Sequence, residues 1–455
     1  MTITTLKQTI RKVVSALAAG TLAIGVFAAD APIGTAAYAD TSFESAATAV
    51  DGMKLGWNLG NTLDSYGEWI ELYTDGSTDK YETAWGNPVA TQSLIAAVKS
   101  EGYGAVRVPV TWAQHIDSNG SIDEDWLDRV QEVVDYVVSQ GLYCVLNVHH
   151  DGGTDGWIEA SAECYEENKG KFAGLWKNIA VRFRNYGEKL IFESFNEVLD
   201  KDDSWTQSSY DEAYEAINSF NQLFVDTVRA TGGNNAVRNL MVQTYSGAAS
   251  TKTLNAFVLP SDSTSGHLIV QVHNYDPQGF TSSTATWTTM TDAWGSDSEK
   301  EYMDDLFQTL GNFSKKIGAP VVLGEFGAEY KYNDAERAEY AGYVIGAAAE
   351  QGIACFWWDV GEMALIDRTT ETASHPLVIA AMLAAAGIDT SADDTQAVSI
   401  GDANADGSIN ALDAALVLQY VVGAAQLSDS SAADANADGS VNTLDAALIL
   451  QWAVG

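Results

Sequence analysis

Short apolar runs of strand length alternate with longer amphipathic stretches between residues 51 and 387. The short runs are rich in β-branched and aromatic residues, as strands buried on both faces are, whereas the longer stretches repeat apolar residues with helical spacing. This alternation predicts repeated βα units and a parallel sheet. Eight strands are predicted, at residues 53–59, 105–110, 143–148, 190–195, 240–243, 268–272, 321–323 and 354–357.

Helices are predicted between several of these strands, at residues 90–100, 125–139, 210–231, 299–316 and 336–351. Four of them end just before a glycine, which is the residue that most easily takes the left-handed conformation after a helix. Those glycines are Gly102, Gly141, Gly318 and Gly352. Eight βα units in one continuous stretch predict an α/β fold, a closed (β/α)8 TIM barrel.

The predicted strands end in polar and aromatic residues. An apolar run beginning at Ile191 ends in Asn196 and Glu197, and a second run beginning at Val321 ends in Glu325. Barrel enzymes place their catalytic groups at this end of the sheet, so the two carboxylates are expected to share one cleft. The other residues at these ends are Arg107, His149, His150, His273, Tyr275 and Trp358, and they include three of the six histidines.

The charge of the chain limits the kinds of molecule that it can bind. The chain has 24 Lys and Arg against 62 Asp and Glu, a net charge of −38, so its surface would repel nucleic acid but not a neutral polymer. No apolar run of membrane-spanning length follows the first forty residues. The cysteines are Cys144, Cys164 and Cys355, and two of them lie in apolar strand-like runs, which indicates core packing rather than a disulfide framework.

The N-terminus has the pattern of an export signal. Lys7, Arg11 and Lys12 precede an apolar stretch over residues 13–29, and small residues before Asp40 offer a cleavage site. A secreted, extracellular protein is therefore expected, with no membrane attachment after cleavage. A membrane anchor that is not cleaved is the alternative, because the segment is long for a signal peptide.

Three chemistries could use the polar strand ends. Zinc hydrolysis would need close ligand spacing such as His-Glu-x-x-His, and serine acyl transfer would need a Gly-x-Ser-x-Gly elbow, and the sequence has neither. Two carboxylates surrounded by Arg, Asn, His, Tyr and Trp suit glycoside hydrolysis. Indole rings could stack on sugars, and half of the following candidates are expected to be core instead: Trp57, Trp85, Trp112, Trp157, Trp205 and Trp358.

Together these motifs resemble glycoside hydrolase family 5, the retaining cellulase group, over nearly all of residues 51–387. The motifs are Gly56-Trp57-Asn58-Leu59-Gly60-Asn61-Thr62-Leu63-Asp64, Glu82-Thr83-Ala84-Trp85-Gly86-Asn87-Pro88, Arg107-Val108-Pro109-Val110, Asn147-Val148-His149-His150-Asp151, Phe195-Asn196-Glu197, Val272-His273-Asn274-Tyr275, Gly324-Glu325-Phe326-Gly327 and Trp357-Trp358-Asp359. Where the family often has Asn-Glu-Pro, this chain has Val198 after the glutamate, a mild departure that affects loop shape rather than chemistry.

The resemblance implies that Glu197 is the acid/base and Glu325 the nucleophile. It also implies a sugar-binding set of Asn58, Trp85, Arg107, His149, His150, Asn196, His273, Tyr275 and Trp358. Arg107 and Tyr275 could stabilise an ionised nucleophile, whereas the acid must stay protonated until it donates. Glu193 is a competing acid, but it is expected to point into the barrel interior below the cleft.

Two copies of one acidic pattern, 32 residues apart, follow residue 400. Oxygen ligands at loop positions 1, 3, 5 and 12, a backbone carbonyl at 7 and glycine at 6 follow the logic of an EF-hand calcium loop. The predicted ligands are Asp402, Asn404, Asp406, Ser408 and Asp413 in the first copy and Asp434, Asn436, Asp438, Ser440 and Asp445 in the second. An acidic solvated tail is the alternative, but such spacing would not repeat by chance.

This segment resembles the dockerin domain of cellulosomal enzymes, because aspartate stands at loop position 12 and no helix precedes either loop. The resemblance implies a small all-α domain with two structural calcium ions and a cohesin module as partner, contacted at loop positions 10 and 11. Those positions are Ala411 and Leu412 in the first loop and Thr443 and Leu444 in the second.

The expected organisation is a signal peptide (1–39), a catalytic barrel (40–388), a linker (389–399) and a dockerin (400–455). The expected function is that of a secreted endo-β-1,4-glucanase acting by retaining double displacement, attached to a cellulosome and needing no cofactor for catalysis. A xyloglucanase, lichenase or xylanase of the same family is the alternative, followed by a polysaccharide-binding barrel without activity.

Overall fold

The computed structural model describes residues 43–152, 156–388, 401–404, 409–425, 427, 430–433, 435 and 440–453. The predicted signal peptide and linker lie outside the described residues. So do five of the predicted calcium ligands, namely Asp406, Ser408, Asp434, Asn436 and Asp438.

Eight parallel strands form a closed barrel in sequence order, and β8 pairs back to β1. The barrel predicted from the sequence is thus confirmed. Most strands begin and end within two residues of their predicted limits, and β7 extends three residues further. Their bounds are β1 Leu55–Asn58, β2 Ala105–Val108, β3 Tyr143–Asn147, β4 Leu190–Glu193, β5 Leu240–Gln243, β6 Leu268–His273, β7 Val321–Phe326 and β8 Ala354–Trp358.

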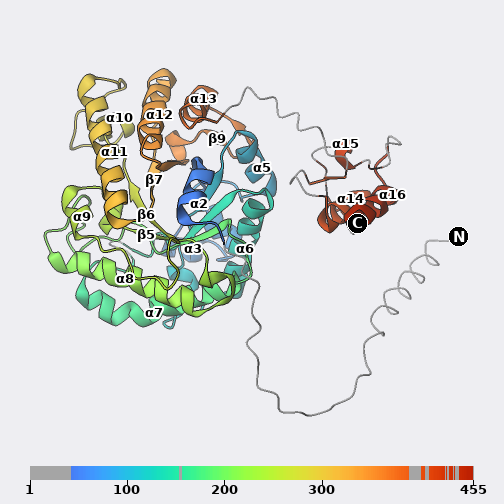
Figure 1. The fold of residues 1–455 in the computed structure, drawn as a ribbon, viewed down its shortest axis with the longest axis horizontal. Helices are drawn as coiled ribbons and strands as arrows, with labels where there is room; N and C mark the ends of the chain where they lie inside the picture. Colours follow the sequence, from blue (N-terminus) through green and yellow to red (C-terminus); the bar gives the residue numbers. More distant parts are fainter. Residues whose placement is uncertain are drawn as a thin grey trace, which may run out of the picture. The chain divides into compact units, whose positions relative to one another are not determined.

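Helices surround the strands on the outside of the barrel (Figure 1). The longer ones are α5 Gln92–Ser100, α6 Glu124–Ser139, α7 Ala162–Arg182, α8 Asp211–Ala230, α11 Asp297–Ile317, α12 Asp334–Ala349 and α13 Pro376–Ala385. The shorter ones are α2 Ala46–Met53, α3 Glu68–Tyr73, α4 Thr78–Glu82, α9 Thr251–Ala256 and α10 Gln278–Thr281. A two-stranded antiparallel pair, β9 Ile366–Asp367 and β10 Thr372–Ala373, follows β8. Within the described ranges, no helix combines the length and apolarity needed to cross a membrane.

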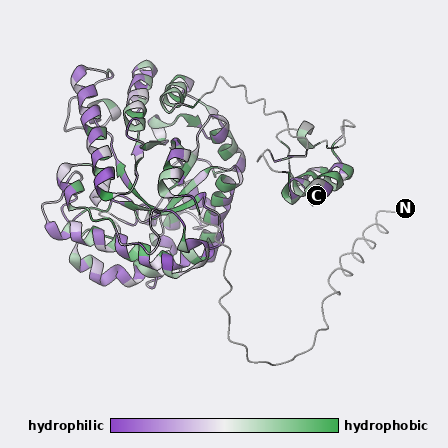
Figure 2. Ribbon diagram, in the orientation of Figure 1, coloured by the Kyte–Doolittle hydropathy of each residue, from purple (hydrophilic) through white to green (hydrophobic). Residues whose placement is uncertain are grey.

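The barrel core has an outer and an inner part. The outer part lies between strands and helices. Figure 2 shows the strands mainly in the colour of hydrophobic residues, whereas the surrounding helices include many hydrophilic ones. The inner part is apolar at the amino ends of the strands, where Ala49 and Met53 of α2 pack beneath Ile191 and Phe356. Cys144 and Cys355 are buried and free, as the sequence predicted.

Polar residues fill the barrel interior toward the carboxyl ends of the strands. Because successive side chains on a strand point to opposite faces, every second residue enters the interior. The fully buried polar residues at these positions are Asn58, Arg107, Asn147, Glu193, Gln243 and Gln271. They form the floor on which the candidate site is built, and Glu193 lies there as the sequence predicted.

Helix α7 was not named from the sequence. It contains Gly170 and Gly174, which lower helix propensity in an exposed position. The structure gives a reason for Gly174: a Cβ there would come within 1.9 Å of the Asn119 carbonyl oxygen. Close packing of the helix against this loop therefore requires glycine.

The described C-terminal residues form a small helical unit with a core of its own, which contains α14 Ala411–Val421, α15 Ser430–Ala433 and α16 Thr443–Ala453. Ala414 and Val417 of α14 pack against Ala446 and Ile449 of α16. The matching positions of the two sequence repeats thus share one small core. The predicted all-α character of this segment is confirmed for the described residues.

Candidate active site

Two irregularities of the sheet orient the central side chains. The pairing of β6 with β7 shifts between Val272 and His273 and aligns His273 with Glu325, and the pairing of β7 with β8 shifts between Leu323 and Phe326. Bulges re-aim side chains beside functional sites. Gly324 stands at this point because a Cβ would lie 2.3 Å from the Gln271 side-chain oxygen.

Arg107 lies at the centre of the polar floor, and all five of its N–H donors are engaged. It donates to both oxygens of Glu193 at 2.7 Å, to Glu325 Oε1 at 2.6 Å, to Asn58 Oδ1 at 3.0 Å and to Asn196 Oδ1 at 2.7 Å. A guanidinium offers five donors in a rigid plane, so the position of each acceptor is fixed. Burial alone would lower the pKa of Arg107, but the adjacent Glu193 and Glu325 carboxylates raise it.

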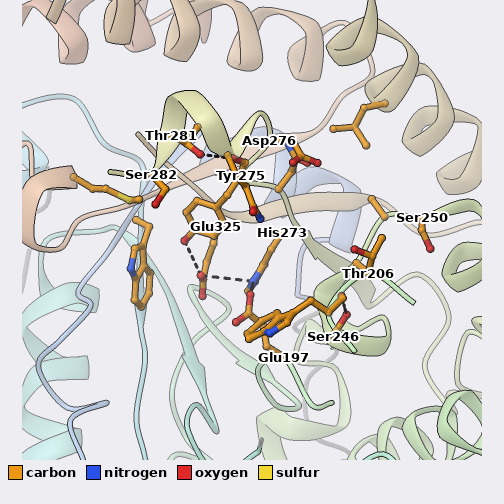
Figure 3. Close-up of a pocket in the computed structure, with 18 of the residues that line it drawn as sticks. Glu197, Thr206, Ser246, Ser250, His273, Tyr275, Asp276, Thr281, Ser282 and Glu325 are labelled. Carbon is orange, nitrogen blue, oxygen red and sulfur yellow. Dashed lines mark hydrogen bonds and ion pairs between the residues drawn. The ribbon is translucent and has the colours of Figure 1, made fainter. Parts of the chain in front are cut away.

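Glu325 projects from β7 and is stabilised as a carboxylate. Arg107 binds one oxygen. The Tyr275 hydroxyl donates to the other at 2.9 Å (Figure 3). Burial raises the pKa of Glu325, whereas the charge of Arg107 opposes that rise. Hydrogen bonds to the charged form favour it, so this carboxylate has the environment of an anionic nucleophile.

Glu197 lies just past β4 in a different environment. Its φ of +45° is in the left-handed region, which a glutamate rarely adopts, and its backbone N–H donates to Gln243 Oε1 at 2.5 Å. Burial raises the pKa of Glu197 to about 7. Backbone strain of this kind concentrates at functional sites, and a carboxyl group with such a pKa can donate a proton at neutral pH.

The two carboxyl groups are close together. One carboxylate oxygen of Glu197 and one of Glu325 lie within 4.8 Å of each other, and both come near the ring of His273. Retaining glycosidases separate their carboxyl groups by about 5 to 5.5 Å, whereas inverting enzymes leave about 6.5 to 9.5 Å for a water molecule. An oxygen–oxygen distance within 4.8 Å is compatible with the retaining arrangement, in which one carboxylate attacks directly.

His273 connects the two carboxyl groups. Its Nδ1 lies 2.6 Å from Glu197 Oε1 and 3.6 Å from Glu325 Oε2. The Nε2 atom lies 3.0 Å from the Gln271 amide nitrogen, which also donates to Glu193. Because an amide N–H must donate to Nε2, we assign the ring proton to Nδ1, which then donates to Glu197. Burial lowers the pKa of His273 to about 4, consistent with a neutral ring.

Gln243 and Gln271 were not identified from the sequence. Each lies in a strand, is fully buried and bonds a residue of the site. A glutamine inside an apolar strand is the signal that could have found them, since a buried amide needs partners.

The carboxylates open into a cleft of about 1250 Å³ at the carboxyl ends of the strands. Its lining includes residues that the resemblance implied as catalytic or sugar-binding, namely His149, His150, Glu197, His273, Tyr275, Glu325 and Trp358. Asn58, Arg107 and Asn196 are buried, and Arg107 donates to the side-chain oxygens of both asparagines. Trp85 packs edge-on against His150 at a ring distance of 5.4 Å.

The tryptophans divide between core and cleft. Trp57 and Trp112 are fully buried core residues, and Trp157 bonds Asp151 at 2.6 Å. Trp205 and Trp358 line the cleft, and so does Trp287, which the sequence analysis did not name. Trp287 lies in a long loop after β6 without strand periodicity, so no pattern marked it.

Two groups of side chains in the described ranges have spacing that could hold a metal: Asp64, His149 and His150, and Glu197, His273 and Glu325. Asp64 accepts from the Asn61 and Thr62 backbone N–H groups at 3.0 and 2.6 Å, so a turn already uses it. Glu197 and Glu325 have the environments of an acid and a nucleophile. Both groups therefore have an explanation without a metal.

The C-terminal unit has donors that suit calcium. Asp413 and Asp445, at position 12 of the two loops, are fully buried. Asp413 accepts backbone N–H groups of Asn404 and Asn410 at 3.1 and 2.8 Å, and Asp445 accepts that of Asn442 at 2.8 Å. Buried carboxylates are costly unless they are paired or bind a metal, so these oxygen donors fit a hard cation.

Two protein-family profiles match this chain, one over the barrel and one over the C-terminal segment. The profile described as "Cellulase (glycosyl hydrolase family 5)" matches residues 63–364. The profile described as "Dockerin type I domain" matches residues 400–451, and type I dockerins typically bind calcium.

Characterised relatives include Endoglucanase B of Clostridium cellulovorans, which is 37% identical over 82% of this chain and 82% of its own length. Endoglucanase A of Clostridium longisporum is 38% identical over 70% of this chain and 60% of its own length. The chain thus spans most of the first relative and somewhat less than two thirds of the second.

Solved structures give the same picture. A family 5 enzyme of Prevotella bryantii B14, in complex with a xyloglucan tetradecasaccharide, has 38% identity and a TM-score of 0.67 over 76% of this chain and 99% of its own. A broad-specificity endoglucanase of Ruminococcus champanellensis with bound cellotriose has 38% identity and a TM-score of 0.69 over 75% and 98%. A lichenase variant of Caldicellulosiruptor sp. F32 with cellotetraose has 34% identity and a TM-score of 0.69 over 80% and 99%. The chain therefore belongs to glycosyl hydrolase family 5, the cellulase family of retaining glycoside hydrolases, and has a type I dockerin domain near its C-terminal end.

Proposed function

We propose that this protein is an endo-β-1,4-glucanase in which Glu325 is the nucleophile and Glu197 the acid/base. The observation that supports this assignment best is the unequal surroundings of the two carboxyl groups. Glu325 accepts from the Arg107 guanidinium and the Tyr275 hydroxyl, which favour its charged form. The carboxyl group of Glu197 lies against the His273 ring instead, and burial raises its pKa to about 7.

The proposed reaction has two displacements. In the first, a Glu325 oxygen attacks the anomeric carbon while Glu197 gives its proton to the departing glycosidic oxygen, so a covalent glycosyl ester forms and the C–O bond breaks. In the second, Glu197 takes a proton from water, the water oxygen attacks the same carbon, and Glu325 leaves as a carboxylate. Both steps invert the centre, so the product keeps the original anomeric configuration.

The remaining residues position the sugar and the two acids. Asn196 is held by Arg107 next to Glu197, where its amide can bond the sugar 2-hydroxyl. His149 stacks parallel to Trp358 at a ring distance of 5.5 Å, and this pair offers an aromatic surface beside the reaction centre. Asn58 donates to backbone carbonyls of Gly324 and Trp357, so it supports the ends of β7 and β8 rather than the sugar.

Mixed-linkage glucan and xyloglucan are proposed as substrates alongside cellulose. The cleft is large, and exposed Trp205 and Trp287 lie along it, so several sugars of a polymer have room on both sides of the carboxylates. Three structural relatives were solved with xyloglucan, cellotriose or cellotetraose. The xyloglucan complex is the observation that favours tolerance of branched chains.

A panel of soluble polymers tests this function. Wild-type protein should release reducing sugar from carboxymethyl cellulose, mixed-linkage glucan and xyloglucan, and much less from xylan. Glu325→Gln should be inactive on all four. Glu301→Gln, which changes an exposed carboxylate on α11, should match the wild type. Activity on xylan alone, or equal activity in Glu325→Gln, would contradict the proposal.

We further propose the domain boundaries 1–39, 40–388, 389–399 and 400–455, with export directed by the first segment. The dockerin would bind two calcium ions and attach the enzyme to a cohesin module of an extracellular cellulosome. The match to a type I dockerin over residues 400–451 supports this role. Leu412 and Leu444, at equivalent positions of the two repeats, are 67% and 66% exposed and so are available to a partner.

A further inference from the structure

Tyr332 combines two unfavourable features. Its φ of +61° lies in the left-handed region, which an aromatic residue rarely adopts, and its side chain is 92% exposed. Neither the fold nor the catalytic residues require a large ring at this position. Since strained residues persist mainly where they have a use, the exposed ring needs an explanation.

The ring of Tyr332 belongs to a small aromatic surface. It contacts Tyr330 at a ring distance of 5.1 Å, and Tyr330 contacts His375 at 4.7 Å. We call these three residues the tyrosine ledge. Tyr330 and His375 are half-buried and limit the positions that the ledge can take, because His375 also lies 2.8 Å from Asp334.

The segment that contains Tyr332 is tightly held. The Lys331 ammonium donates to the carbonyls of Phe280 and, at 2.8 Å, Thr291. Asn333 donates to the Asp292 carbonyl at 2.8 Å and accepts from the Lys331 backbone N–H at 3.0 Å. A ring on a rigid segment loses little conformational entropy on binding, so the ledge is preorganised.

The ledge continues the wall of the cleft. Glu329, one residue before Tyr330, lines the cleft, and the Tyr330 backbone N–H donates at 2.7 Å to the carbonyl of Glu362, which lines it too. The ledge also lies where α12 and α13 begin, and these helix starts face the same end of the barrel as the carboxyl ends of the strands. A polymer leaving the cleft over Glu329 and Glu362 would therefore meet Tyr332 next.

We propose that the tyrosine ledge is a further carbohydrate-binding site, which stacks a glucosyl unit of a β-1,4-glucan chain as it leaves the cleft. The flat apolar face of a β-linked glucosyl ring matches an exposed phenol ring in shape and chemistry. A neutral sugar suits this position because Glu329 and Glu362 beside it would repel an anionic ligand. The inference rests on the proposed glucanase function and extends it to a site outside the catalytic cleft.

Two substitutions of Tyr332 separate the effect of its ring from the effect of its backbone conformation. Tyr332→Asn removes the ring but keeps a residue that tolerates positive φ, so the fold should be as stable or slightly more stable. Tyr332→Phe keeps the ring without the hydroxyl. Tyr73→Asn is the control, since Tyr73 is 83% exposed on α3 and does not line the cleft.

The readout is KM against kcat on soluble xyloglucan and on an aryl cellobioside, which is too short to reach the ledge. Tyr332→Asn should raise KM for the polymer about two- to tenfold, the range expected for one aromatic contact, with kcat unchanged. The polymer KM and kcat of Tyr332→Phe and of the control Tyr73→Asn should match those of the wild type. On the aryl cellobioside, all three variants should match the wild type.

An unchanged polymer KM in Tyr332→Asn would overturn the ledge, as would an equal rise in Tyr332→Phe or in Tyr73→Asn. A loss on the aryl cellobioside would also overturn it, because the effect would then come from the catalytic cleft. Absence of wild-type activity on every β-glucan would instead refute the proposed function, so the two failures are distinguishable.

Discussion

Replacement of Glu197 by glutamine should remove activity and at the same time stabilise the fold at alkaline pH. Glutamine has the shape of the protonated acid and can still accept from His273 Nδ1, which lies 2.6 Å from the carboxylate. The wild-type protein must instead keep an ionised carboxylate in a site that burial makes unfavourable for charge. Function and stability therefore oppose each other at this residue.

The size of the effect follows from the pKa of Glu197. Burial raises it from 4.5 to about 7, a difference that corresponds to about 3 kcal/mol. The side chain is 21% exposed, so solvent reduces this figure, and a gain of about 1 to 3 kcal/mol is expected in the variant.

The sign depends on pH. Below pH 4.5 the carboxyl group is protonated in both folded and unfolded chains, and wild type and variant should have equal stability. Between 4.5 and 7 the unfolded chain ionises first, so wild-type stability falls as pH rises, and above 7 the full difference remains.

Thermal unfolding of both proteins should be compared at pH 4 and pH 8. The Glu197→Gln variant should melt about 1 to 4 °C higher at pH 8 and equally at pH 4, since 1 kcal/mol shifts the Tm of a domain of about 350 residues by about 1 to 2 °C. Glu301→Gln should show no pH-dependent difference. An equal Tm difference at both pH values, or a lower Tm at pH 8, would refute the reasoning.

Three further predictions concern catalysis and the dockerin. The kcat/KM of the wild type should fall above about pH 7, where Glu197 loses its proton. It should also fall at acid pH, with a midpoint above 4.5, because Glu325 then gains a proton. A profile still rising at pH 9 would contradict the role of Glu197 as the acid. Glu325→Ala should be inactive on every substrate. Glu197→Ala should still form the glycosyl-enzyme from aryl glycosides with good leaving groups, which would be seen as a burst of released phenol. Equal loss of activity on aryl glycosides and polymer in Glu197→Ala would count against its acid role. Chelation of calcium should unfold residues 400–455 and release a cohesin partner, because this segment is too small to bury much core alone. Glucanase activity should not change. Full helicity of the isolated segment in chelator, measured by circular dichroism, would disprove this dependence on calcium.

The barrel and its main polar residues could be predicted because one rule connects them. Parallel strands of a closed barrel end at the same rim, so polar residues that follow apolar runs must gather there. Glu197 and Glu325 are far apart in sequence, but one carboxylate oxygen of each lies within 4.8 Å of the other. The same rule placed His149, His273 and Trp358 on the cleft.

The residues that escaped prediction depend on register and loop shape. Gln243 and Gln271 lie within strands, and only the register of the closed barrel shows that they point at His273 and Glu193 rather than at a helix. Trp287 and Tyr332 lie in long connections, whose course is set by contacts such as those of Lys331. A pattern of apolar residues contains no information on such contacts.

The sequence alone also could not distinguish candidate residues that touch substrate from those that support them. Asn58 was grouped with the sugar-binding residues, but its side chain is buried and bonds Arg107, Gly324 and Trp357. A motif identifies which residues recur together, whereas the distance to the cleft separates those that can touch substrate from those that support them.

Covalent trapping of the glycosyl-enzyme tests the central claim most directly. A 2-deoxy-2-fluoro cellobioside with a good leaving group should react with the wild type, because the fluorine slows release of the ester more than its formation. Peptide mapping by mass spectrometry should then find the added sugar on the peptide that contains Glu325, and Glu325→Gln should remain unlabelled. A label on Glu197, Glu193 or any other residue would contradict the assignment, and so would an unlabelled wild type that releases a product of inverted configuration.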